Sequence, residues 1–119
     1  MRRRKVLLID ANPAYERKNE GRLIHEFLNI IEAKSDYKRV KSKKELLKLL
    51  ERSRHGIIHI SAHGEKDEIC VGRGKVTVND ILNIGEKRKA NGLRKAMLVI
   101  CSACHGGSED IASAFVKAI

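Results

Sequence analysis

Two short segments of the sequence carry residue types that can perform nucleophilic chemistry. His63 and Gly64 follow the strand-like run from Ile57 to Ala62, and Cys104 comes shortly after the apolar run from Ala96 to Cys101. A cysteine nucleophile needs a nearby base and peptide N–H groups that hold an oxyanion. Glycine beside each of these residues leaves those N–H groups accessible. The pattern therefore indicates a Cys–His pair if folding brings the two segments together.

The elements that would position this pair can be predicted from the hydrophobic pattern. Val6 to Ile9, Ile57 to Ala62 and Ala96 to Cys101 are short runs typical of strands buried on both faces. Amphipathic helices are predicted over residues 14–33, after Ser42, and from Ser108 onward. This alternation predicts an α/β fold with a mainly parallel central sheet and helices on both faces. Function in such a sheet gathers at the carboxyl ends of the strands.

Three further segments have weaker patterns. Residues 37–40 predict a short edge strand, and residues 65–78 predict a hairpin around Gly72 to Gly74. Thr77 or Asn79 is expected to cap a short helix from Asp80 to about Ile84. The polar stretch 86–92 predicts a loop or a frayed continuation of that helix.

The two motifs resemble those of the caspase-like cysteine peptidases, the group of caspases, metacaspases, separase and CHAT domains. Residues 57–64, with His59 on the same strand, look like the CHAT histidine motif, and residues 99–104 look like its Ser-Ala-Cys motif. Residues 104–107 are also similar to the metacaspase Cys-His-Ser-Gly run. The similarity covers nearly the whole chain. It implies a three-layer caspase-like fold in which residues 1–119 form a single domain, the N-terminal catalytic portion, without the last strands.

The resemblance implies a cysteine endopeptidase that hydrolyses peptide bonds through an acyl-enzyme. His63 and Cys104 would be the catalytic pair, and the backbone N–H groups of Gly64 and Cys104 would form the oxyanion hole. Ser102 and His105 would line the substrate pocket. Ser102 stands where metacaspases carry an aspartate that contributes to a pocket for Arg or Lys, so basic specificity does not carry over. The expected partner is a peptide or protein substrate, and no cofactor is expected.

Other interpretations of the same residues are weaker. The run from Cys101 to His105 matches a c-type haem attachment pattern and contains the spacing of a thioredoxin-like redox pair. However, Cys101 ends a buried apolar run, whereas haem attachment needs an accessible loop. This run also lies late in the chain, whereas a thioredoxin-like pair typically opens the helix after the first strand. A zinc site would draw on both Cys101 and Cys104, which alternation along a strand separates. His59 and His63 lie about 13 Å apart along a strand and cannot share a metal. We therefore expect no metal site.

The remaining cysteines and histidines have structural interpretations. Cys70 and Cys101 are expected to be small core residues. His59 is expected to be buried and hydrogen-bonded. His25 is expected on the surface or flank of the first helix, and His55 in a turn.

Composition excludes some classes of protein and raises one further partner. The 119 residues are 42% hydrophobic and carry a net charge of +10. With no apolar run of roughly 20 residues and no secretory signal, a cytoplasmic protein without a membrane span is expected. Nine basic and three acidic residues lie between Lys34 and Arg54. A solvated helix face is the simplest interpretation of that stretch. Aromatic residues are scarce, so any nucleic-acid affinity is expected to be non-specific.

Two other functions fit the same predicted fold. One is a catalytically silent caspase-like interaction module, and the other is a basic nucleic-acid-binding α/β domain. The strand that precedes Cys104 is also expected at a sheet edge, where Met97, Leu98 and Val99 would favour self-association or pairing with a partner. Peptidase activity is expected to be weak until further strands complete the cleft.

Overall fold

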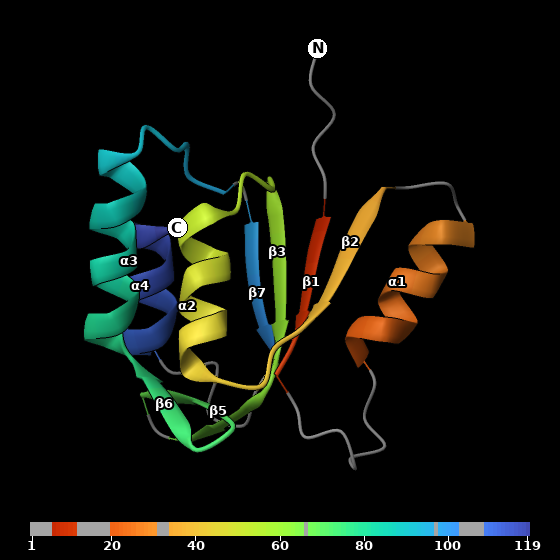
Figure 1. Ribbon diagram of the computed structural model, residues 1–119, viewed down its shortest axis with the longest axis horizontal. Coiled ribbons are helices and arrows are strands. Elements are labelled where there is room, and N and C mark those ends of the chain that lie inside the picture. The colour runs from red at the N-terminus through yellow and green to blue at the C-terminus, as the bar shows by residue number, and fades with distance from the viewer. Residues whose placement is uncertain (1–5, 12–19, 31–33, 66, 97, 103–108) are drawn as a thin grey trace.

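A four-stranded parallel sheet forms the centre of the chain (Figure 1). The computed structural model describes residues 6–11, 20–30, 34–65, 67–96, 98–102 and 109–119. The sheet has the order β2-β1-β3-β7 and consists of β1 (Val6–Asp10), β2 (Ser35–Arg39), β3 (Ile57–Ser61) and β7 (Leu98–Ser102). Each predicted buried run forms one of these strands, and the predicted edge strand is confirmed as β2. The predicted α/β class with a parallel sheet is therefore confirmed.

Helices lie on both faces of this sheet, as predicted (Figure 1). One face carries α1 (Glu20–Ile30), which contacts β1 and β2 most closely. The other face carries α2 (Lys43–Arg52), α3 (Val78–Ala90) and α4 (Glu109–Ala118). Residues 14–19 and 31–33, which belong to the predicted first helix, and Ser108 lie outside the described residues. Among the helices of the described residues, none has both the length and the apolar character needed to cross a membrane.

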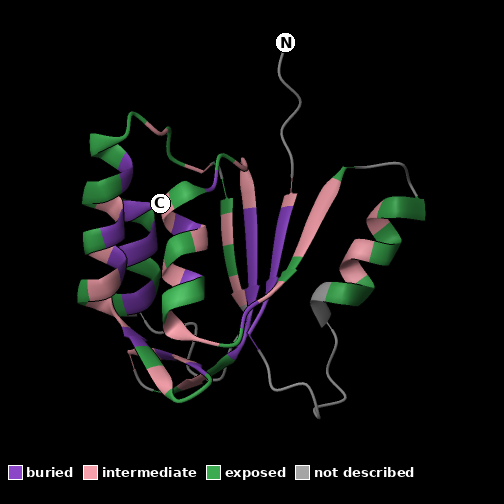
Figure 2. Ribbon diagram, viewed as in Figure 1, coloured by how far each residue is buried: buried purple, intermediate pink, exposed green. Residues whose placement is uncertain are grey.

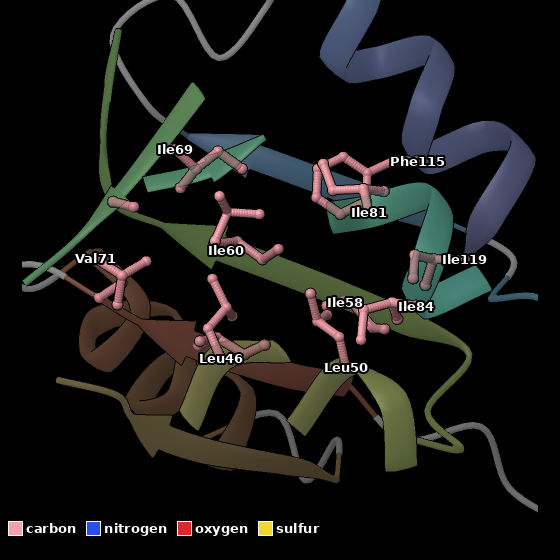
Figure 3. Close-up of a cluster of buried hydrophobic side chains, with 14 of the residues drawn as sticks. Leu46, Leu50, Ile58, Ile60, Ile69, Val71, Ile81, Ile84, Phe115 and Ile119 are labelled. Atoms are coloured by element: carbon pink, nitrogen blue, oxygen red, sulfur yellow. The ribbon is translucent and has the colours of Figure 1, made fainter. Parts of the chain in front are cut away.

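The main core lies between the sheet and the three helices α2, α3 and α4 (Figure 3). Alternate residues of β1 and β3 point into it, because successive side chains of a strand point to opposite faces. Figure 2 shows that the two central strands are largely buried. The fully buried side chains of this core come from the sheet and from all three of these helices, and include Leu7, Ile9, Leu46, Leu50, Ile58, Ile60, Ile81 and Ile111.

A small antiparallel sheet follows β3 directly. It consists of β4 (His63–Glu65), β5 (Glu68–Val71) and β6 (Gly74–Thr77), in the order β4-β5-β6. The predicted hairpin is confirmed as β5 and β6, but the sequence did not reveal that His63 and Gly64 belong to a third strand. Gly72 has a φ of +59°, and a Cβ there would collide with the carbonyl oxygen of Lys41. The hairpin turn therefore packs against the segment that leads into α2.

Two of the predicted helix caps are present. The Oγ of Ser42 accepts a 3.2 Å hydrogen bond from the backbone N–H of Glu45 at the start of α2. At the start of α3, Thr77 and Asp80 form a reciprocal capping box. Such caps satisfy backbone N–H groups that have no partner within the helix.

The helix α3 is longer than the prediction that ended it near Ile84. It continues to Ala90, so the alternative of a helical continuation is the one observed. Arg88 explains part of this, because it is only 2% exposed and its guanidinium donates to three backbone carbonyls. The acceptors are Leu50 and Ser53, each at 2.7 Å, and Arg94 at 2.8 Å. The polar sequence therefore hides a buried anchor that holds the end of α3 against α2.

The later part of α3 also packs closely against α4. A Cβ at Gly85 would lie 2.6 Å from both the Cα and the Cβ of Ala118 in α4. Glycine is unfavourable within helices because of its conformational freedom. Here the absence of a side chain lets the two helices approach, which accounts for glycine at this position.

Candidate functional site

The strands that lead to His63 and Cys104 are neighbours in the sheet. β3 and β7 pair in parallel, and Ser61 at the end of β3 is the register partner of Ser102 at the end of β7. His63 and Cys104 each follow this pair by two positions in the sequence. Cys104 and His105 lie outside the described residues. The structure thus confirms the condition on which the predicted pair depends, that its two strands end side by side.

His63 begins β4 and is exposed to solvent. Its partner across the antiparallel ladder is Cys70 of β5. Side chains opposite one another in such a ladder have Cβ atoms about 5 Å apart, so His63 and Cys70 are direct neighbours. The sequence pattern did not predict that His63 and Cys70 face each other. Gly64, the predicted oxyanion donor, follows in β4 opposite Ile69.

Cys70 does not have the properties of a nucleophile despite this neighbour. Its side chain is half-buried, whereas a core position was expected. Burial raises the pKa of the Cys70 thiol, and the carboxylate of Glu65 raises it further, against a smaller opposite effect of Lys75. Because the thiolate is the reactive form, this environment disfavours Cys70 as a nucleophile.

Cys101 is a structural thiol. It lies in β7 and packs against the main core. Burial raises its pKa to about 11. The expectation of a structural role is confirmed, and Cys101 is unsuited to nucleophilic attack.

A buried polar cluster lies at the carboxyl end of β1, next to the end of β3. Asp10 is fully buried and is the register partner of Ser61. The hydroxyl of Tyr37 donates to its Oδ2 at 2.8 Å, and Arg39 Nη1 lies 3.4 Å from the same oxygen. A buried carboxylate requires such partners because its desolvation is costly. This cluster was not predicted. The sequence indicates it only through an aspartate that follows directly on the apolar residues Val6 to Ile9.

Three histidines of the described residues have structural surroundings. His59 is buried in β3, with 5% of its surface exposed, so the predicted burial is confirmed, whereas its buried Nδ1 makes no hydrogen bond within the described residues. His55 lies in the loop before β3, where Nε2 is 2.7 Å from the carboxylate of Asp36 and Nδ1 is 2.8 Å from Ser53 Oγ. His25 Nδ1 lies 2.5 Å from Ser35 Oγ and joins α1 to β2. In the part of the chain that is described, no three His, Cys, Asp or Glu residues gather as metal ligands.

An open apolar hollow of about 320 Å³ lies beside β7. Within the described sheet β7 is an edge strand, as predicted, and Leu98 and Ile100 are 48% and 42% exposed. Val99 is half-buried, and Met97 lies outside the described residues. The hollow is formed by β7, the residues around it and α4, and is lined by Ala96, Leu98, Val99, Cys101, Ala112, Phe115, Val116 and Ile119.

Comparison with known proteins identifies no relative, since no protein-family model and no curated protein matches the chain. Inference about function therefore rests on the residues and their positions in the fold.

Proposed function

We propose that this chain is a cysteine endopeptidase of the caspase-like, CHAT type, with His63 and Cys104 as its catalytic pair. The caspase-like character of the fold belongs to the same proposal. A parallel sheet with helices on both faces supports it, together with the small antiparallel sheet that begins at His63. A reducing compartment such as the cytoplasm would keep the thiol available.

The observation that carries the proposal is the pairing of β3 with β7. Ser61 and Ser102 are register partners, so the two reactive residues follow strand ends that lie next to each other. In the order β2-β1-β3-β7, the chain leaves β1 toward β2 on one side and leaves β3 toward β7 on the other, so the strand order reverses between β1 and β3. Ligands of open α/β sheets bind at the carboxyl ends of strands at such a reversal, and His63 follows one of these two strands.

The proposed mechanism divides peptide hydrolysis into two steps. The Cys104 thiolate attacks the carbonyl carbon of the scissile bond, and the N–H groups of Gly64 and Cys104 stabilise the oxyanion that forms. His63 protonates the leaving amine, so the peptide C–N bond breaks and a thioester remains. His63 then removes a proton from water, whose oxygen attacks the thioester, releasing the acid and the Cys104 thiol.

The two described cysteines support the choice of Cys104 indirectly. Burial raises the pKa of both Cys70 and Cys101, to about 11 for Cys101. Both environments therefore disfavour the thiolate that a nucleophile requires. His63, in contrast, is exposed at the strand end and accessible to a substrate.

The test is covalent labelling with a peptide acyloxymethyl ketone, followed by mass spectrometry of the modified peptides. We expect one adduct, on Cys104, which is lost in Cys104→Ala. His63→Ala should slow labelling by about 10²-fold or more, the usual range for a catalytic acid or base. Cys70→Ala and Cys101→Ala are matched controls and should label at the wild-type rate. Equal labelling of all three cysteines, or labelling at Cys70, would show that Cys104 is not the activated thiol.

A further inference from the structure

The outer side of α2 carries a row of cations. Lys44, Lys48 and Arg52 recur every four residues and are all exposed, opposite the buried Leu46 and Leu50. Four residues of α-helix rise about 6 Å, so the three charges follow one line along the helix.

Further exposed cations flank this helix in the sequence. Exposed cations lie before it, at the end of β2 and in the segment that follows, and after it, in the loop that leads to β3. Together these residues form what we call the basic face: Lys38, Lys41, Lys44, Lys48, Arg52 and Arg54. None of the exposed large hydrophobic residues among those described lies in this segment.

Ion pairs do not account for these six cations. Across the described residues, none of them forms an ion pair, whereas their neighbours Arg39 and Lys43 are paired with Asp10 and Asp80. The carboxylate of Glu45, beside the row, lies 3.5 Å from the Ser42 hydroxyl. The helix dipole favours Arg52 in the last turn of α2 but disfavours Lys44 in the first turn. Folding stability therefore does not account for the row as a whole.

We propose that the basic face binds the phosphate backbone of a nucleic-acid duplex. Phosphate contacts by lysine and arginine release bound counterions, and this supplies affinity without apolar contacts. A protein partner of comparable affinity would require apolar or aromatic anchors, which this face lacks. The apolar side of α2 is buried in the core, so it is not available for insertion into a membrane surface. The basic face contains no aromatic residue on which the bases of a single strand could stack.

The binding has no sequence preference, because phosphate contacts alone carry no base information. The proposal is independent of catalysis, since no residue of the basic face belongs to the proposed catalytic pair. Loss of labelling at Cys104 and loss of duplex binding are therefore separate outcomes.

The experiment is fluorescence anisotropy with the 119-residue chain and DNA and RNA duplexes of about 20 base pairs, between about 50 and 200 mM salt. The test variant replaces Lys44, Lys48 and Arg52 with Gln. The matched control replaces Lys89, Lys95 and Lys117 with Gln, exposed residues on α3, the following loop and α4. Both variants lose three positive charges, and circular dichroism verifies that both are folded.

We expect both duplexes to bind the wild-type chain, with an affinity that falls steeply as salt rises. Three phosphate contacts correspond to about a 40-fold change in affinity over this range of salt. The test variant should therefore show a salt slope smaller by about 3, and the control a slope close to that of the wild type. Equal losses in both variants would mean that net charge, not this face, attracts the duplex. No binding at the lowest salt, or binding of polyglutamate or phosphatidylserine vesicles in preference to the duplexes, overturns the proposal.

Discussion

The hydroxyl of Tyr37 in β2 donates a 2.8 Å hydrogen bond to the buried carboxylate of Asp10 in β1. The bond crosses between two neighbouring strands at the edge of the sheet that carries the proposed site. Burial raises the pKa of Tyr37 above its ordinary value of 10.0, and the hydrogen bond to Asp10 raises it further.

Tyr37→Phe should destabilise the fold and change its response to alkaline pH. Loss of a hydrogen bond to a charged group costs about 2 kcal/mol at neutral pH. Because the folded protein holds the tyrosine proton more tightly, the unfolded chain loses that proton first as pH rises above 10.0. The contribution of Tyr37 is thus present below this pH and is lost as pH rises through the folded pKa. Urea unfolding should show that the free energies of unfolding of the wild type and of Tyr37→Phe differ less at alkaline pH than at neutral pH. A difference that does not change with pH would contradict this prediction.

Cys101 should react slowly with alkylating agents. Its pKa is raised from 9.0 to about 11 by burial, so the reactive thiolate is about a hundredfold less populated at neutral pH. Alkylation by iodoacetamide, followed by mass spectrometry, should be at least that much slower than for a cysteine in an unfolded peptide, and should accelerate toward pH 11. Rapid alkylation at neutral pH under native conditions would be inconsistent with this environment.

Arg88→Met should be strongly destabilising although the side chains are similar in size. The substitution leaves the buried carbonyls of Leu50 and Ser53 without the donor that now satisfies them. We expect a loss of about 3 kcal/mol or more in the free energy of unfolding. Lys89→Met, at the adjacent exposed position, is the control and should change it by less than about 0.5 kcal/mol. Similar urea midpoints for both variants would show that Arg88 is not an anchor.

Gly85→Ala should destabilise the chain, contrary to the usual effect of this substitution. Within a helix, alanine is normally more stable than glycine by about 1 kcal/mol. Here the new Cβ would lie 2.6 Å from Ala118 and would push α3 and α4 apart, at a cost of about 1–3 kcal/mol. Asn83→Ala, at an exposed position of the same helix, should leave thermal stability unchanged or slightly raised. An increase in Tm for Gly85→Ala would refute the close packing.

The edge strand β7 should mediate pairing with a second copy of the chain. Its outer backbone groups have no strand partner in the described sheet, and Leu98 and Ile100 are exposed. Such an edge is a template for strand pairing. Light scattering should reveal self-association that Ile100→Lys abolishes. Leu23→Lys introduces the same charge on α1, where Leu23 is 65% exposed, and should not affect it. A monomer at all concentrations would contradict this expectation.

Most of the sheet was predictable from the sequence because β1, β3 and β7 are largely apolar runs with clear boundaries, whereas the polar edge strand β2 has only a weak pattern. The strand ends were predictable for the same reason, and with them the expectation that His63 lies at the carboxyl edge. The full length of α3 was not, because Arg88 appears in the sequence as one more cation in a polar stretch. Only its three carbonyl partners, which come from distant segments, make it a core residue.

The neighbours of the proposed site were also beyond the reach of sequence patterns. Cys70 lies opposite His63 because of the register between β4 and β5. Asp10 acquires its role from Tyr37 and Arg39 in another strand. Periodicity reports which side of an element is buried, whereas these contacts depend on how strands align with one another.

The pairing of β3 with β7 also determines how local opening affects the proposed site. Residues 62–97, which include β4, β5, β6 and α3, lie between the two strands, so the contact of the strands is non-local and carries the entropy cost of bringing distant segments together. Within the described sheet β7 has strand bonds on one side only. Edge elements with few partners open at lower free energy than central ones. Detachment of β7 would separate the two strand ends while β1, β3 and α2 remain folded. The geometry of the proposed site would consequently be lost on warming before helical structure is, so the site would be lost by opening at one edge of the sheet and not by unfolding of the whole chain.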